Sequence, residues 1–453
     1  MGPMAMGPIL SMGYDNVMRR LSALEAVDLF ETSDALGLPL GPAQPAALLE
    51  AMGSRKDWED LRVFGALMTV LTDLFTHPNV HYLSGFYGPL ERLLRDSGAN
   101  IGFAPADFRR FVALLGAICP RVMATAASPP DADGFCSLSL HAGANVGALH
   151  AAGADPHRLL VVEVSDRYPV TYGLGEHGHR LHVDEIDVLI ESESTPYELV
   201  DPEPSGIERA IAEHIRTVIP DGATLQTGIG PVPSVVATLL AERDGGDYGV
   251  HSEMFTTGLM KLHQAGKVSN QRKGQFEGVS ICTFAGGTRE LYDWLDGNRE
   301  VAFLPVEIVN SPDIISVNEN MVTINAALAV DIHGQVVADT RSGEQFSGIG
   351  GHEDFVAGAG LDLADRSILC LPSTYRAGEE VHSRIVPWFA AGAVITTPRH
   401  QVDAIVTEFG IAELQGKTVH QRGEALAAIA HPDFRDELLG AAERASGGRS
   451  PVR

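Results

Sequence analysis

The alternation of apolar and polar residues predicts helices and strands that succeed one another along most of the chain. Apolar runs typical of buried strands occur at 121–125, 159–164, 224–227, 301–304, 367–371 and 393–396. Helical spacing predicts helices over 44–52, 108–118, 207–218, 234–242 and 433–445. Partial alternation over 321–339, with a His-Gly turn at 333–334, predicts a β-hairpin. Helices alternating with buried strands indicate an α/β fold with mostly parallel sheets.

The expected division into domains follows from length and from a change in composition. A chain of 453 residues is longer than one hydrophobic core normally supports, so two domains are expected. The polar, proline-containing stretch 191–205 is the predicted linker. We therefore expect a disordered leader over 1–20, an N-terminal α/β domain over 21–195 and a C-terminal α/β domain over 206–453.

Charge and cysteine usage narrow the class of protein. The chain has 33 Lys and Arg against 59 Asp and Glu, and a net charge of −26 argues against nucleic acid. An anionic ligand would need a locally positive site of backbone N–H groups, helix N-termini and a few Lys or Arg. No apolar run reaches the roughly 18–20 residues that cross a bilayer, so no membrane is expected. Four separated cysteines without a CxxC pair indicate reduced thiols and a cytoplasmic protein.

The stretch 250–258, VHSEMFTTG, contains the main candidate for chemistry, Glu253. A lone glutamate is usually a solvated surface residue. His251, Met254 and Phe255 are poor surface residues, however, and the strand-like run indicates a strand end that enters a pocket. A carboxylate with an ordinary pKa of about 4.3 is ionised at neutral pH and can attack a thioester without a base.

Two glycine turns lie on either side of this glutamate in the chain. The turn at 228–233, GIGPVP, follows a predicted strand and precedes a predicted helix, an arrangement that presents backbone N–H groups to a ligand or an oxyanion. It lacks the third glycine of the dinucleotide fingerprint, so a nicotinamide cofactor is not expected. The turn at 348–351, GIGG, is either an ordinary loop or a close approach of backbone to a ligand. A carboxylate between two such turns suits covalent acyl chemistry on a large anionic cofactor.

Three other chemistries are disfavoured. The 17 histidines include no HExxH pair, and the cluster of His177, His179 and His182 lacks paired carboxylates, so no metal is expected. The sequence has no GxSxG elbow of a serine hydrolase and no GxxxxGK[ST] phosphate loop.

The motifs together closely resemble the family I coenzyme A transferases, in the acetyl-CoA hydrolase/transferase and butyrate/4-hydroxybutyrate CoA-transferase group. The resemblance covers most of the chain and is densest after residue 205. Its segments are SPPDADGFCSLS at 128–139, EVSDRYPVTYG at 163–173, LQTGIGPVP at 225–233, VHSEMFTTG at 250–258, GKVSNQRK at 266–273, MVTINAALAVDIHGQVVAD at 321–339, FSGIGGHEDFVAGA at 346–359, LPSTYRAG at 371–378, the run 383–418 and IAHPDFRDEL at 429–438.

The resemblance implies two related α/β domains with the active site between them, and it places the catalytic glutamate at Glu253. The positions that it implies for the oxyanion and CoA thioester site are Gly228, Gly230, Val232, Gly348, Gly350 and Gly351. The substrate-pocket candidates are Gln226, Asn325 and His352. A homodimer or a higher homo-oligomer is also implied.

The expected activity is transfer of CoA from an acyl-CoA to a short carboxylic acid such as acetate, by a ping-pong route through a Glu253 thioester. CoA is then a substrate, and no permanently bound cofactor is expected. Hydrolysis of acyl-CoA at the same site is one alternative, and an acyl-CoA-binding regulatory protein without turnover is another. The sequence departs from the family pattern at Thr256-Thr257-Gly258, at His352 and over 81–111. These positions are expected to shape the selectivity for the acyl group, so the departures bear on the substrate more than on the chemistry.

Overall fold

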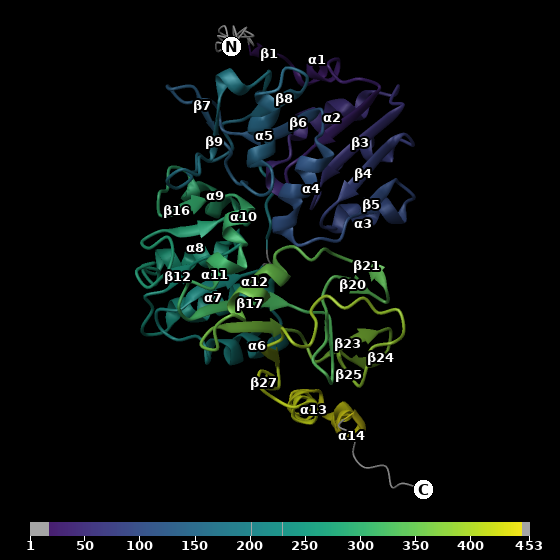
Figure 1. Ribbon diagram of the computed structural model, residues 1–453, viewed down its shortest axis with the longest axis vertical. Coiled ribbons are helices and arrows are strands. Elements are labelled where there is room, and N and C mark those ends of the chain that lie inside the picture. The colour runs from purple at the N-terminus through teal and green to yellow at the C-terminus, as the bar shows by residue number, and fades with distance from the viewer. Residues whose placement is uncertain (1–17, 201, 229, 446–453) are drawn as a thin grey trace, which may run out of the picture.

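The computed structural model of the protein describes residues 18–200, 202–228 and 230–445, and it is built on two sheets, one on each side of the predicted linker (Figure 1). The first sheet has eight strands in the order β1-β10-β8-β6-β2-β3-β4-β5, and all its pairs are parallel. Its strands are β1 (Arg19–Arg20), β2 (Ser33–Gly37), β3 (Asp60–Gly65), β4 (Val80–Ser84), β5 (Ile101–Phe103), β6 (Val122–Ala127), β8 (Leu159–Val164) and β10 (Val188–Glu191).

The second sheet has six strands in the order β12-β11-β17-β22-β26-β27, parallel except for the antiparallel pair β26–β27. Its strands are β11 (Thr224–Thr227), β12 (Gly249–Val250), β17 (Met321–Ala326), β22 (Arg366–Cys370), β26 (Ala404–Thr407) and β27 (Gly410–Glu413). Between β10 and the helix α6, the described residues form neither helix nor strand. The predicted α/β class with mostly parallel sheets is confirmed.

Helices and short strand pairs complete the two halves. The helices are α1 (Ala23–Val27), α2 (Ala46–Ser54), α3 (Pro89–Asp96), α4 (Phe111–Ile118), α5 (Val146–Gly153), α6 (Gly206–Arg216), α7 (Pro231–Glu242), α8 (Thr257–Gln264), α9 (Arg289–Leu295), α10 (Val306–Val309), α11 (Pro312–Ile315), α12 (His352–Ala359), α13 (Val419–Ala428) and α14 (Arg435–Ala445). The paired short strands are β7 (Phe135–Ser137) with β9 (Arg180–His182), β13 (Met254–Phe255) with β15 (Phe284–Ala285), β14 (Ser280–Cys282) with β16 (Val301–Phe303), β18 (Ala329–Asp331) with β19 (Val336–Val337) and β25 (Ile385–Val386), β20 (Thr340–Arg341) with β21 (Glu344–Gln345), and β23 (Thr374–Ala377) with β24 (Glu380–Ser383).

Except for 393–396, the apolar runs of the sequence become strands that are buried on both faces. In β8, which coincides with the predicted run 159–164, Leu160 and Val162 enter the largest apolar cluster. Leu159 and Val161 point to the other face and enter a second cluster, because successive side chains of a strand alternate. The largest cluster also contains Leu225 of β11, so the two halves share one continuous core.

The strand predicted over 393–396 is wrong, because that segment forms no strand. Its neighbour Thr397 makes a single isolated bridge with Val336, and Thr396 donates its backbone N–H to the Val336 carbonyl oxygen at 2.9 Å. The Thr396 hydroxyl donates to Asp339 at 2.6 Å. Since β19 is only two residues long, the apolar run has no extended partner on which to build a ladder.

The hairpin predicted over 321–339 is correct only in its second part. The first part forms β17, which lies inside the second parallel sheet and pairs with β11 and β22. The antiparallel pair β18–β19 flanks the predicted turn at 333–334. The Asp331 carboxylate closes this turn by accepting from the backbone N–H groups of His333 and Gln335, at 3.0 and 2.9 Å.

Several boundaries also differ from prediction, and two of the differences bear on the site and on the start of the fold. Helix α7 begins earlier, at Pro231, because proline is well suited to the first helical position. Arg19 and Arg20 form β1 beside β10, so the fold begins before the end of the expected 1–20 leader. Residues 1–17 of that leader lie outside the described residues.

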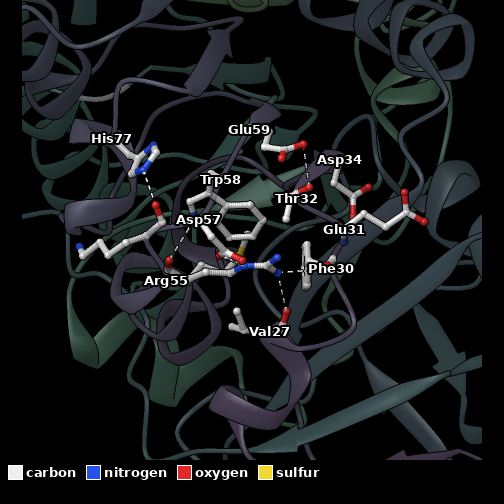
Figure 2. Close-up of polar contacts among 12 residues, drawn as sticks. Val27, Phe30, Glu31, Thr32, Asp34, Arg55, Asp57, Trp58, Glu59 and His77 are labelled. Atoms are coloured by element: carbon white, nitrogen blue, oxygen red, sulfur yellow. Dashed lines mark hydrogen bonds and ion pairs between the residues drawn. The ribbon is translucent and has the colours of Figure 1, made fainter.

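A polar cluster around Arg55 lies near the residues where strands β2 and β3 begin, and Figure 2 shows it. The Arg55 guanidinium donates to the carbonyl oxygens of Val27 and Phe30, at 3.2 and 2.8 Å, and pairs with Asp57 at 2.6 Å. It also lies over the Trp58 ring, 4.3 Å from the centroid. These contacts join the end of α2 to the segment before β2.

Candidate active site

A cavity of about 910 Å³ lies between the two halves of the chain. From the first half it is lined by residues that directly follow parallel strands, such as Leu38 after β2, Ala66 after β3 and Gly85 after β4. From the second half it is lined by Gln226 of β11 and Asn325 of β17. The carboxyl ends of parallel strands are the usual place for a ligand in α/β folds. The cavity is therefore the candidate active site.

Glu253 lies on the wall of this cavity, between β12 and β13. Its carbonyl oxygen accepts the backbone N–H groups of Thr283 and Phe284, at 2.9 and 3.2 Å. The two residues before it are held by strands as well. The backbone N–H groups of His251 and Ser252 donate to the carbonyl oxygens of Leu225 and Ile281, each at 3.1 Å. The backbone on both sides is thus fixed, and the carboxylate is the part that faces the cavity.

The Glu253 carboxylate has few hydrogen-bond donors. Asn310 donates its side-chain amide to Glu253 Oε2 at 2.6 Å, and Gly351 supplies a backbone hydrogen bond. The same Asn310 Nδ2 lies 3.1 Å from Asp354 Oδ2, so one amide serves two carboxylates. Asn310 follows α10 and was not identified from the sequence, because nothing in its local pattern marks it.

Burial raises the pKa of Glu253 to about 7. The Asn310 and Gly351 hydrogen bonds lower it, and the charge of Asp354 raises it. The ordinary pKa of about 4.3 assumed from the sequence is therefore wrong for this site. At neutral pH the group is a mixture of protonated and ionised forms, and the ionised form is more basic than a solvated carboxylate.

Asp354 links the site to the first half of the chain. It is buried in α12, and burial raises its pKa to about 6. Arg109 donates its Nε to Asp354 Oδ1 at 2.5 Å, and the neighbouring Phe108 N–H donates to the Gly350 carbonyl oxygen at 2.9 Å. Both residues belong to the segment 81–111, whose sequence matched the family pattern poorly. That segment therefore forms part of the site.

The second glycine turn brings backbone directly against Glu253. A Cβ at Gly351 would lie 1.8 Å from Glu253 Oε2 and 2.4 Å from Asn310 Nδ2. A Cβ at Gly348 would lie 2.8 Å from the Cα of Phe86, which belongs to the first half. Such distances exclude any side chain, so glycine is required for this approach. The turn therefore contacts both the candidate glutamate and the opposite half.

The first glycine turn lies at the same cavity but contributes differently. Gly228 lines the cavity, and its N–H donates to the Ile324 carbonyl oxygen at 3.2 Å. This donor is already used by the sheet, which contradicts the expectation that it is available to an oxyanion. Gly230 caps α7 with φ of +116°, and the side chain of Val232 packs into the largest apolar cluster.

The three pocket candidates all line the cavity. The side-chain amides of Gln226 and Asn325 bond to each other, with N–O distances of 3.3 and 3.2 Å. His352, the first residue of α12, lies 2.8 Å from the Thr397 hydroxyl. Burial lowers the pKa of His352 to about 4, so its ring is neutral at pH 7.

One wall of the cavity is apolar. It is formed by one cluster of buried side chains that also line the cavity, namely Leu40, Phe108, Ala144, Met254 and Phe284. Among the described residues that line the cavity, the formally charged side chains are Glu253 and Arg92. The site thus combines one buried carboxylate, a few amides and glycine backbone, and a large apolar surface, which suits acyl transfer from a thioester.

Solved structures share this fold. RipA from Yersinia pestis is 32% identical, with a TM-score of 0.85, and the match covers 94% of this chain and 97% of that chain. A 4-hydroxybutyrate CoA-transferase from Porphyromonas gingivalis is 30% identical, with a TM-score of 0.76 and coverage of 94% and 98%. The fold is that of a CoA transferase.

Sequence comparisons agree. The family model of the acetyl-CoA hydrolase/transferase C-terminal domain matches residues 287–442. The 4-hydroxybutyrate coenzyme A transferase of Clostridium kluyveri is 39% identical over 312 residues, which cover 69% of this chain and 70% of that protein. The succinyl-CoA:cyclohexane-1-carboxylate CoA transferase of Geobacter metallireducens is 34% identical over 427 residues, with coverage of 93% and 94%. The chain belongs to the family I CoA transferases.

Among the described residues, no helix combines the length and the apolar content that crossing a bilayer requires.

Proposed function

We propose that this CoA transferase moves CoA from an acyl-CoA to a short-chain carboxylate of the acetate type, by a ping-pong mechanism through a glutamyl-CoA thioester at Glu253. The observation that carries the proposal is the buried carboxylate on the cavity wall, whose pKa of about 7 makes its ionised form basic and weakly solvated. CoA acts as a substrate, and no permanently bound cofactor takes part.

The first half-reaction begins with the Glu253 carboxylate, whose oxygen attacks the carbonyl carbon of the acyl-CoA thioester. The C–S bond breaks, CoA leaves as the thiolate, and an acyl-glutamyl anhydride forms. The thiolate then attacks the glutamyl carbonyl carbon, the original acyl group leaves as a carboxylate, and a glutamyl-CoA thioester remains. In the second half-reaction an acceptor carboxylate repeats these steps in reverse, which yields the new acyl-CoA and free Glu253.

The chain supplies the groups that these steps need. Asn310 donates to Glu253 Oε2, so the same hydrogen bond can stabilise that oxygen when the attack of the thiolate on the glutamyl carbonyl carbon makes it negative. Gly351 allows backbone to approach the reacting atoms, because it has no Cβ. The apolar wall limits the access of water, which would otherwise hydrolyse the anhydride or the thioester.

The names of the relatives favour transfer over hydrolysis. A butyryl-CoA:acetate CoA-transferase from Anaerostipes caccae is 33% identical over 94% of this chain. The acetyl-CoA hydrolase of Yarrowia lipolytica is 27% identical over 49% of it. Hydrolysis at the same site remains the second candidate, and a binding protein without turnover is the third.

Intact-protein mass spectrometry after mixing with acetyl-, propionyl-, butyryl- and succinyl-CoA tests the proposal. We expect a CoA-sized adduct, and after borohydride reduction a modified peptide that contains Glu253. The Glu253→Gln variant serves as the control and forms no adduct. CoA binding without an adduct would favour the regulatory protein. Release of free acid without any acceptor would favour the hydrolase.

We further propose that the enzyme is cytoplasmic, as its four separated cysteines without a CxxC pair indicate, and that it forms a homodimer or a higher homo-oligomer, as the family resemblance implies. Size-exclusion chromatography with light scattering measures the mass of the particle in solution. A mass of one chain over a wide concentration range would contradict the oligomer.

A further inference from the structure

Three arginine side chains, Arg92, Arg341 and Arg384, gather on one side of the cavity. Arg92 lines the cavity itself, and the Arg92 and Arg341 guanidinium groups lie over the same Phe346 ring, 4.3 and 3.6 Å from its centroid. Arg384 donates to the carbonyl oxygen of Leu328, another cavity residue, at 2.8 Å. The cluster therefore spans the region from the cavity wall to solvent, where Arg341 is exposed.

These arginines come from separate parts of the fold that the β20–β21 hairpin brings together. Figure 1 places the hairpin between α3 of the first half and the β23–β25 region of the second half. The contact with α3 is direct, because Arg92 donates to the Phe346 carbonyl oxygen and Arg95 to the Gln345 carbonyl oxygen, each at 2.6 Å. The hairpin is thus held against the cavity by backbone contacts.

The cluster lacks acidic partners. Within the described part of the chain, Arg92, Arg341 and Arg384 form no salt bridge, whereas the neighbouring Arg95 pairs with Asp96 at 2.8 Å. Burial and the charge of Arg341 both lower the pKa of Arg92 and of Arg384, while the charges of Glu91 and Asp96, which do not pair with Arg92, raise the pKa of Arg92. Like charges held together without a counter-ion are costly, and this chain has 59 acidic residues against 33 basic ones. Such an arrangement indicates an anion that binds there.

The three guanidinium groups differ in how many of their N–H donors bond to the protein. Arg92 and Arg384 each donate to backbone carbonyl oxygens, which is a sufficient structural role for them. Arg341 contacts the Phe346 ring and makes no side-chain hydrogen bond to a described residue, so its full set of guanidinium donors remains available. Guanidinium groups bind phosphate oxygens through paired N–H donors.

We infer that Arg341, supported by Arg92 and Arg384, forms the subsite for the phosphate groups of the CoA nucleotide. This inference rests on the proposed function, because it assigns a binding site to the CoA that Glu253 would receive. Coenzyme A combines a reactive thiol end with a phosphorylated nucleotide end. The cavity offers a carboxylate for the first, and the arginine cluster lies beside the cavity, where the second would project toward solvent.

The test compares substrates that differ only at the nucleotide end. Steady-state transfer to acetate is measured with butyryl-CoA, with butyryl-dephospho-CoA and with butyryl-pantetheine, in the wild type and in Arg341→Ala. Arg341→Lys tests rescue by a cation, and Arg216→Ala on α6, where the arginine pairs with Glu213 at 2.8 Å, is the matched control for loss of an exposed charge. Isothermal calorimetry with CoA is run on all variants in parallel.

We expect Arg341→Ala to raise KM for butyryl-CoA roughly tenfold, the effect of losing one charge-assisted hydrogen bond. The kcat value and the kinetics with butyryl-pantetheine stay unchanged, and Arg341→Lys recovers part of the loss. Unchanged affinity for CoA in Arg341→Ala, or an equal loss with butyryl-pantetheine, would overturn the inference. If the wild type uses none of the three acyl donors, the proposed function fails instead. The calorimetry then still decides whether Arg341 binds CoA.

Discussion

The two walls of the cavity differ in what they contribute. The first half of the chain supplies mainly apolar surface, with Leu40 and Phe108 in the cluster next to Glu253. The second half supplies the carboxylate, the Asn310 amide and the glycine turn that ends at Gly351. In the proposed mechanism the reaction needs both walls, because the apolar wall removes solvent from a carboxylate that the polar wall holds in place.

Two buried glutamates show that burial alone does not produce a reactive carboxylate. Glu91 of α3 is completely buried and accepts backbone N–H groups from Met68 and Gly88, at 2.6 and 2.8 Å, and the Ser84 hydroxyl at 3.3 Å. Its oxygens are thus occupied by structural donors. Glu253 has fewer donors and faces an open cavity, which is why the proposed mechanism assigns the nucleophile to it and not to Glu91.

Removing the carboxylate should have the largest effect on activity. We expect Glu253→Ala to lower kcat/KM for transfer at least roughly thousandfold, because the covalent route loses its nucleophile. The measurement is transfer from butyryl-CoA to acetate, with CoA affinity determined by calorimetry as a check that the fold is intact. Full transfer activity in this variant would show that the polar wall does not supply the nucleophile.

A side chain added at the glycine turn should break the contact between backbone and carboxylate. In Gly351→Ala the new Cβ would lie 1.8 Å from Glu253 Oε2, so the carboxylate must move. We expect kcat/KM to fall about a hundredfold, since small displacements at a reacting centre cost this much. Gly360→Ala, at the end of α12, is the control. Equal activity of the two variants would mean that the turn tolerates a side chain.

The pH dependence of transfer tests the desolvation by the apolar wall. Only ionised Glu253 is a nucleophile, so kcat/KM of the wild type should fall about tenfold per unit below pH 7 and level off above it. Asn310→Ala removes a donor that favours the ionised form, and its profile should shift to higher pH with roughly tenfold less activity at pH 7. An acid limb near pH 4.5 in the wild type would contradict the raised pKa.

The smallest expected effect is on stability. Because the folded-state pKa of Glu253, about 7, exceeds its ordinary value of 4.5, the protonated group contributes stability below pH 4.5 that is lost as the pH rises through 7. Glu253→Gln should therefore stabilise the protein at pH 8 by about 1–3 kcal/mol and have little effect at pH 5. Urea unfolding at both pH values measures this difference. The same gap at both pH values would rule out the ionised carboxylate as its cause.

The sequence determined what depends on local pattern. The runs 159–164 and 224–227 form β8 and β11, and the residues and the family resemblance predict Glu253 and the turn at 348–351 as site positions, which line the cavity. The apolar run 393–396 forms no strand, because a strand requires a partner strand that the sequence pattern does not reveal.

Tertiary structure alone decided the surroundings of the glutamate. Asn310 is 57 residues away from Glu253 in sequence, and Arg109 is 245 residues away from Asp354, so no spacing rule connects them. The use of the Gly228 N–H within the sheet and the arginine cluster around Phe346 likewise follow from how the chain folds back on itself. A pKa depends on burial and on neighbouring charges in space, which is why the sequence identified the carboxylate but only the fold set its pKa.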